Sequence, residues 1–183
     1  VALAGSSLVS TGGDISVSGD AVGGTGVLFW SVYDSGSGSN IYSSIITGSG
    51  AITLDSTGLR GLGLGGITLA TDSGDIHLSG TALDAYATAA VFLGSGGVTT
   101  NGGDITITGT GGATGVWLYE GDLISNGGDI SVTGEGFHYG VQVWDNLVSS
   151  GSGAITITGT ATGDDSTGLN VRDAAIAATS GNI

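Results

Sequence analysis

The sequence contains no cysteine, no methionine and no proline. Without cysteine there is no disulfide pattern from which a cellular compartment could be read. Without proline, the 39 glycines cannot belong to a collagen helix. No apolar run approaches the roughly 20 residues that a transmembrane helix needs, so we expect no membrane insertion. The first residue is Val1 and lies in the middle of a repeat, with no signal peptide in view, so we expect a segment of a longer protein.

Basic residues are almost absent as well. The chain has two Lys or Arg against 16 Asp or Glu, which gives a formal net charge of −14. Nucleic-acid binding depends on basic side chains that neutralise phosphates, so we expect no nucleic-acid partner. An anionic membrane surface would repel this chain for the same reason. The acidity instead favours solubility.

What the sequence has is a repeat. A Gly-x-Ile motif with Asp, Ala or Asn at its middle position occurs seven times, and these middle residues are 37, 24, 29, 25, 25 and 28 positions apart. The middle residues are Asp14, Ala51, Asp75, Asp104, Asp129, Ala154 and Asn182. Periods of roughly 20–50 residues are typical of solenoids and related arrays.

The repeat 104–128 predicts three strands. Ile105–Thr108 alternates apolar and polar residues, as a half-buried strand does, and Gly109–Gly112 follows as a turn. Val116–Tyr119 alternates again, Glu120–Asp122 breaks the pattern, and Leu123–Ser125 forms a short third strand. Glycine and β-branched residues are poor helix formers. We therefore predict an all-β fold, a parallel β-helix (β-solenoid) with about three short strands per coil and mostly 24–29 residues per coil.

We expect one stack over residues 1–183. It begins with a partial coil at 1–13, and the full coils are 14–50, 51–74, 75–103, 104–128, 129–153 and 154–181. The isoleucines of the motif should form one internal column: Ile15, Ile52, Ile76, Ile105, Ile130 and Ile155. The long first coil carries an insertion near 34–40, which should be a surface loop. Neither end shows a polar capping coil, so stacking on another copy or on neighbouring coils is an expected contact.

Units such as Gly102-Gly103-Asp104-Ile105-Thr106-Ile107-Thr108-Gly109 resemble the repeats of filamentous-haemagglutinin-type adhesins and autotransporter passenger regions. The resemblance covers essentially the whole chain. It implies a large bacterial secreted β-helix protein, located outside the cell or at its surface. No stretch matches that family's N-terminal secretion domain or its C-terminal membrane barrel.

Four aspartates share one repeat position: Asp14, Asp75, Asp104 and Asp129. Stacked carboxylates repel one another unless something screens them, and Ca²⁺ binds clustered oxygen ligands. The alternative is that each Asp lies in a turn and accepts a hydrogen bond from nearby backbone N–H groups. We favour the turn, because alanine and asparagine fill the same position elsewhere, and we expect no cofactor, with Ca²⁺ as the alternative.

The outward positions of the first strand carry mostly hydroxyl groups. They are Ser16, Ser18, Thr53, Ser79, Thr106, Thr108, Ser131, Thr133, Thr156 and Thr158. Such a ladder resembles the ice-binding face of some antifreeze proteins, but Thr also suits any exposed strand. His77 and Asp55 interrupt the ladder, so we favour the structural explanation.

The second strands predict an aromatic face. If Val27, Val116 and Val141 point inward, strand alternation turns the aromatic residues of these strands and Gln142 outward. The predicted interaction face comprises Leu28, Trp30, Phe92, Trp117, Tyr119 and Trp144. Contiguous exposed apolar surface usually marks an interaction site, here for glycans, a host or cell surface, or another rod. A register shift of one residue would instead bury these side chains.

Evidence for catalysis is sparse. Polysaccharide-active β-helix enzymes use clustered Asp with Lys or Arg, whereas Arg60 and Arg172 are four coils apart. His77 and His138 are isolated, and Asp164 and Asp165 share a glycine-rich turn.

We therefore expect no enzyme and no catalytic residues. The expected function is that of a non-catalytic extracellular structural or adhesive rod of a bacterial surface or fibre protein. The alternatives are a filament subunit that stacks end to end, a polysaccharide-active enzyme and an ice-binding protein.

Overall fold

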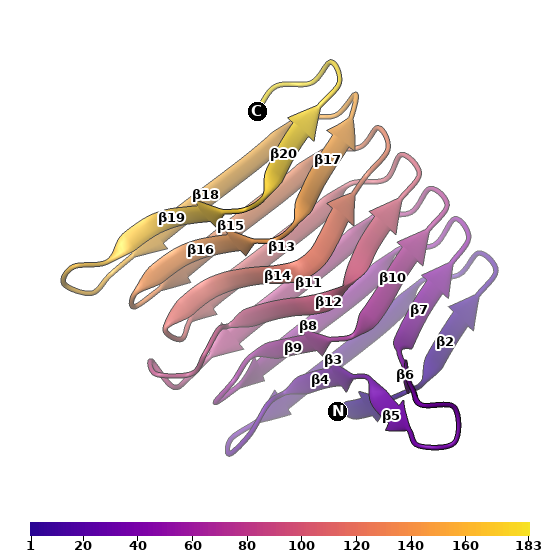
Figure 1. The fold of residues 1–183 in the computed structure, drawn as a ribbon, viewed down its shortest axis with the longest axis horizontal. Coiled ribbons are helices and arrows are strands. Elements are labelled where there is room, and N and C mark those ends of the chain that lie inside the picture. The colour runs from indigo at the N-terminus through magenta and orange to yellow at the C-terminus, as the bar shows by residue number, and fades with distance from the viewer.

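The computed structural model describes residues 1–183. The chain forms a β-solenoid in which parallel strands stack in about 7 turns, without any helix (Figure 1). The predicted fold class is confirmed. No helix of the structure is long and apolar enough to cross a membrane.

The first face of the solenoid is a six-stranded parallel sheet that contains the first strand of each coil. Its strands are β3 (Ile15–Ala21), β8 (Ile52–Gly58), β11 (Ile76–Ala82), β13 (Ile105–Gly111), β15 (Ile130–Gly136) and β18 (Ile155–Ala161). The motif isoleucines stand opposite one another across all six strands, from Ile15 to Ile155. The predicted isoleucine column is therefore confirmed.

Two further faces complete each coil. The second face contains β1 (Ala2–Ala4), β4 (Val27–Trp30), β9 (Leu62–Gly65), β16 (Tyr139–Trp144) and β19 (Thr167–Arg172). The third face contains β2 (Ser7–Ser10), β7 (Ser43–Thr47), β10 (Ile67–Thr71), β17 (Leu147–Gly151) and β20 (Ala175–Ala178). Two long strands, β12 (Val91–Thr100) and β14 (Thr114–Ile124), continue from the second face into the third.

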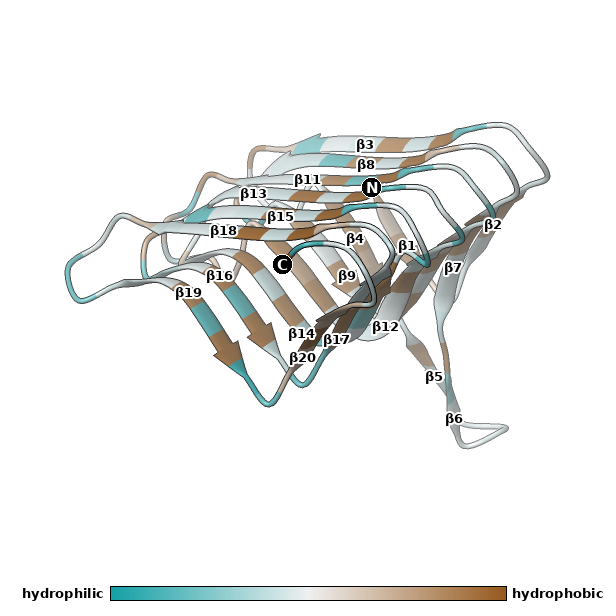
Figure 2. Ribbon diagram, turned by 90° about the horizontal axis from the view of Figure 1, so that it is seen from above, coloured by the Kyte–Doolittle hydropathy of each residue, from teal (hydrophilic) through white to brown (hydrophobic).

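The main core is a cluster of 25 buried aliphatic and aromatic residues that runs along the axis, and a small second cluster comprises Ala82, Ala87 and Ala90. Figure 2, which views the stack obliquely, shows apolar segments that alternate with polar ones along the strands. Alternation is the reason: each strand turns every second side chain inward, and the parallel register stacks these side chains coil upon coil. Leu8, Ile45, Leu69, Val98, Leu123, Val148 and Ile176 make the inward column of the third face.

The corner between the second and third faces differs from the prediction. We expected a break in the strand at 120–122. Instead β14 continues, and the chain turns through one residue with positive φ. In two coils this residue is a glycine, Gly5 (53°) or Gly66 (72°), and in four coils it is not: Ser95 (51°), Glu120 (54°), Asp145 (54°) and Asp173 (50°). A single left-handed residue bends the strand enough, and polar residues such as Asp tolerate this conformation at moderate cost.

The predicted turn at 109–112 is also wrong for three of its four residues, because β13 extends to Gly111. Gly109 occupies an inward-facing position of β13, where the first and second faces converge. A Cβ atom on Gly109 would lie 2.1 Å from the carbonyl oxygen of Gly115. Glycine therefore occupies this position because nothing larger fits, not because the chain turns there.

The insertion in the first full coil forms an antiparallel hairpin of β5 (Val32–Asp34) and β6 (Ser39–Ile41), which projects from the body (Figure 2). The surface location agrees with the prediction, but the hairpin was not anticipated. At its tip, the backbone N–H of Gly36 donates to the Asp34 carboxylate at 2.9 Å. This bond is the main reason that the pKa of Asp34 lies below its ordinary value.

The structure has a buried column of hydroxyl groups that was not predicted from the sequence. In five coils the residue three positions before the motif glycine donates its hydroxyl to the carbonyl of that glycine: Thr47, Thr71, Thr100, Ser125 and Ser150. All five are buried, so each bond satisfies a polar group inside the corner. The fixed spacing of Ser or Thr before the glycine was the available signal.

Candidate functional site

The second face carries two outward columns of side chains. One column runs Leu28, Gly63, Phe92, Trp117, Gln142 and Asn170. The other runs Trp30, Gly65, Gly94, Tyr119, Trp144 and Arg172. Parallel strands in register lie about 4.8 Å apart, so side chains in one column are direct neighbours. The aromatic residues therefore gather over three consecutive coils.

Trp117 is the centre of an aromatic cluster. Its ring centroid lies 5.4 Å from that of Phe92 and 5.3 Å from that of Trp144, both edge to face, and 5.9 Å from that of Tyr119. Edge-to-face pairs of this kind contribute about 0.5–1.5 kcal/mol each beyond the area they bury. The rings therefore support one another and form a fixed wall.

Beside this wall lies a groove of about 560 Å³. The residues that line it are Thr25, Leu28, Arg60, Leu62, Gly63, Thr88, Ala89, Phe92, Trp117, Tyr119 and Trp144. Gly63 forms part of its floor between Leu28 on the preceding coil and Phe92 on the following one. Because Gly63 has no side chain, the surface is hollow at this point.

Five of the six residues of the predicted interaction face line this groove, and Trp30 does not. Trp30 lies in the same column as Tyr119, but Gly65 and Gly94 separate the two, and its side chain is 39% exposed. Gln142 stands in the outward column but is only 4% exposed. Its amide oxygen accepts a hydrogen bond of 3.0 Å from the Thr114 hydroxyl.

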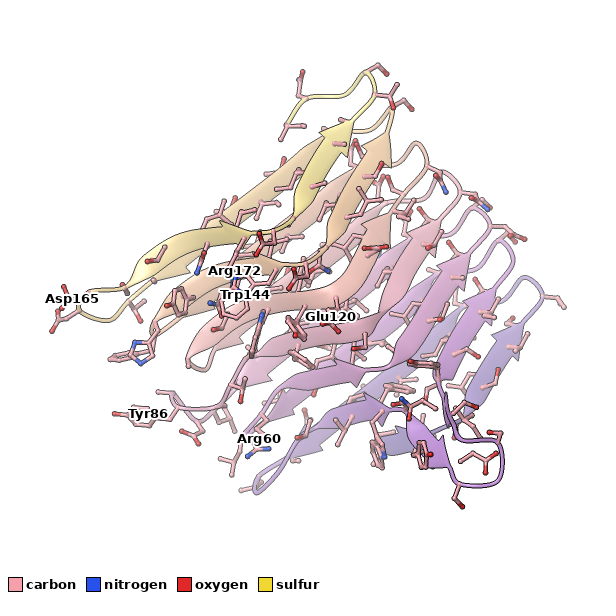
Figure 3. All side chains as sticks on the ribbon, in the orientation of Figure 1. Arg60, Tyr86, Glu120, Trp144, Asp165 and Arg172 are labelled. Atoms are coloured by element: carbon pink, nitrogen blue, oxygen red, sulfur yellow. The ribbon has the colours of Figure 1, made fainter.

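Charged residues flank the aromatic wall. The guanidinium carbon of Arg172 lies 5.2 Å from the ring centroid of Trp144, and its Nε is 3.2 Å from the carboxylate of Asp173 (Figure 3). Glu120 is at the corner toward the third face (Figure 3). A hydrogen bond with the Glu120 side chain, followed by the negative charge of Glu120, raises the pKa of the Tyr119 phenol.

In the sequence, Arg60 is a candidate only as a partner for catalytic carboxylates. The structure places it at the groove, just before β9, where it is exposed. Sequence spacing could not show this, because Arg60 lies in a corner segment whose path depends on neighbouring coils.

The aspartate column has a structural explanation. The Asp14, Asp75, Asp104 and Asp129 carboxylates each accept a hydrogen bond of 2.7–2.8 Å from the backbone N–H of the same position in the next coil. The prediction that these aspartates accept backbone hydrogen bonds is confirmed, but the donor belongs to the next coil and not to the same turn. No three His, Asp or Glu side chains gather in a way that could hold a metal ion.

The remaining candidates lie apart from the groove. The hydroxyl ladder is on the first face, where β3 to β18 stack in register with His77 and Asp55 among the hydroxyls. Asp165 projects on a loop at the far edge (Figure 3). His138 contacts Phe137, with ring centroids 4.8 Å apart. The structure does not bring these groups together.

Comparisons of the chain with protein-family models, curated proteins and solved structures found no match.

Proposed function

We propose that this chain is a non-catalytic extracellular β-solenoid rod that binds glycans in the groove of the second face. The observation that supports this most is the continuous wall of Phe92, Trp117 and Trp144 beside the hollow over Gly63. Aromatic side chains offer apolar area at low conformational cost and retain polar edges toward water. A sugar ring has the matching character, with apolar C–H faces and a hydroxyl rim.

The shape of the site supports a small ligand over a flat protein partner. A volume of about 560 Å³ lies within the range of roughly 300–1,000 Å³ that is typical of small-molecule sites. Such sites combine an apolar lining with a few polar groups that orient the ligand. Thr25, Thr88 and the Tyr119 phenol supply those groups here.

The indole nitrogens add a second source of polar contacts. The Nε1 atoms of Trp117 and Trp144 are buried and have no hydrogen-bond partner within the chain. An unpaired buried donor costs free energy, roughly 1–3 kcal/mol. A small turn of either ring would let a sugar hydroxyl accept from it.

Binding is tested by calorimetric titration of the whole chain with a panel of neutral and acidic oligosaccharides. We expect at least one to bind and to change the tryptophan fluorescence. Trp117→Ala should weaken that binding by roughly 5- to 150-fold, which corresponds to the 1–3 kcal/mol typical of a nucleobase stacked on an aromatic side chain. Trp30→Ala removes a tryptophan outside the groove and should leave binding unchanged.

A glycine pair on β9 provides a second test. A new Cβ at Gly63 would lie 2.7 Å from the flexible end of Leu28 and at an ordinary contact distance of 3.8 Å from the Thr25 methyl group, so Gly63→Leu should fold and fill the hollow. Gly65→Leu is the matched control on the same strand, where a new Cβ meets nothing closer than 3.7 Å. Thermal melting checks the fold of both. If no oligosaccharide binds, or if Gly63→Leu and Trp117→Ala both bind as the parent does, the proposed function is wrong.

A further inference from the structure

The second face holds both of the basic residues of the chain. The sequence has only two Lys or Arg residues, compared with 16 Asp or Glu residues. Arg60 lines the groove, and Arg172 lies over Trp144 (Figure 3). Arg60 precedes β9 and Arg172 is on β19, so the strands that carry the aromatic cluster, β12, β14 and β16, lie between the two arginines along the stack. Figure 3 shows Trp144 next to Arg172.

The two arginines are not equivalent. Arg172 is paired with the carboxylate of Asp173 at 3.2 Å and lies over the ring of Trp144. Arg60 takes part in no ion pair, and its guanidinium makes no hydrogen bond within the chain. Arg60 is therefore the one unpaired cationic side chain of the molecule, and it faces the groove.

A guanidinium presents parallel N–H donors that match the two oxygens of a carboxylate. We propose that the groove takes an oligosaccharide that bears an isolated carboxylate, and that Arg60 binds this carboxylate while Phe92 and Trp117 contact the sugar rings. This inference rests on the proposed glycan binding. Gly63 and Arg60 line the same groove, so the guanidinium is the cationic group available to the carboxylate of a sugar ring seated there.

The charge of the ligand is limited by the rest of the surface. The formal net charge of −14 creates a field that repels polyanions. Glu120 and Asp145 lie at the corner bordering the aromatic face, next to Tyr119 and Trp144 in the chain. One unpaired cation compensates one negative charge, so the ligand carries a single carboxylate, of the uronate or sialate kind, on an otherwise neutral chain.

The test compares each acidic oligosaccharide with its own neutral counterpart. A panel of glucuronate-, galacturonate- and sialate-containing oligosaccharides is titrated before and after chemical reduction of the carboxylate to a primary alcohol. For the acids that bind, we expect roughly tenfold to hundredfold tighter binding than for the reduced forms at low salt, as a charge-assisted hydrogen bond provides. The difference should shrink as salt is added.

Arg60→Gln should abolish this preference, so that each acid and its reduced form bind with the same affinity. Arg172→Gln is the matched control and should retain the preference. If the acids bind no more tightly than their reduced forms, or if Arg60→Gln keeps the difference, the inference is overturned. If the acid and its reduced form bind equally well and Trp117→Ala abolishes the binding of both, the proposed glycan binding stands and only the role of Arg60 is overturned. If neither form binds, the proposed glycan binding and the role of Arg60 are both overturned.

Discussion

The carboxylate of Asp104 accepts a hydrogen bond of 2.8 Å from the backbone N–H of Asp129, its counterpart in the next coil. The N–H of Asp104 in turn donates to the carboxylate of Asp75 at 2.8 Å. The column is thus a chain of coil-to-coil contacts at the start of the first face. A backbone donor for each carboxylate offsets the repulsion between like charges that stacking creates.

Replacing Asp104 should test this contact. We expect Asp104→Ala to lower the free energy of unfolding by about 1 kcal/mol, because the N–H of Asp129 loses its acceptor. Asp104→Asn keeps an acceptor oxygen and should cost less. Denaturant unfolding measures both, with Asp72→Ala as a control at an exposed aspartate outside the column. Equal stability of the alanine variant and the parent would show that the contact contributes nothing.

The isoleucine column should not tolerate a charge. Ile105 is completely buried, so Ile105→Asp places an unpaired carboxylate in the core. We expect a loss greater than the roughly 2–5 kcal/mol typical of truncation of a buried isoleucine to alanine, or no cooperative unfolding at all. Thermal melting followed by circular dichroism measures this, and Thr108→Asp on the outward side of the same strand should melt near the parent. Parent-like melting of Ile105→Asp would contradict the internal position.

The narrow corner at Gly109 predicts an unusual sensitivity to a single methyl group. Gly109→Ala should destabilise the fold by at least about 1–3 kcal/mol, because the new Cβ would lie 2.1 Å from a backbone carbonyl oxygen that cannot move aside easily. Thr110→Ala, at the next residue and pointing outward, should change stability little. A stable Gly109→Ala variant would show that the two faces can separate at this corner.

The Tyr119 phenol should titrate above the ordinary value of about 10, because its hydrogen bond with Glu120 and the negative charge of Glu120 raise its pKa. The interaction therefore stabilises the fold at pH values below the ordinary tyrosine pKa and is lost as the pH rises through the raised pKa of Tyr119. Ultraviolet absorbance of phenolate, taken as the difference between the parent and Tyr119→Phe, follows this group among the five tyrosines. Glu120→Gln should lower the pKa of Tyr119, and an unchanged titration would exclude Glu120 as the cause.

Part of the aromatic site was predictable. The alternation of Val116, Trp117, Leu118 and Tyr119 indicates which side chains face outward, because the apolar core selects one register. The structure follows this pattern, with Val116 and Leu118 buried and both aromatic residues half-buried on the outside. The alternation within one strand does not predict which outward side chains of different coils contact one another. Trp30 is excluded from the cluster because the intervening coils have glycine at its position.

The sequence by itself determined the period, the strand content and the inward columns, because these follow from local alternation and from the return of the Gly-x-Ile motif. Only the tertiary structure decided that Gly109 fills a narrow corner, that the Asp104 carboxylate reaches the next coil, and that Arg60 joins the aromatic wall. Each of these depends on contacts between residues about 25 or more positions apart, or between two faces that converge. Their geometry is set by how the coils stack and bend, and a one-dimensional pattern does not contain it.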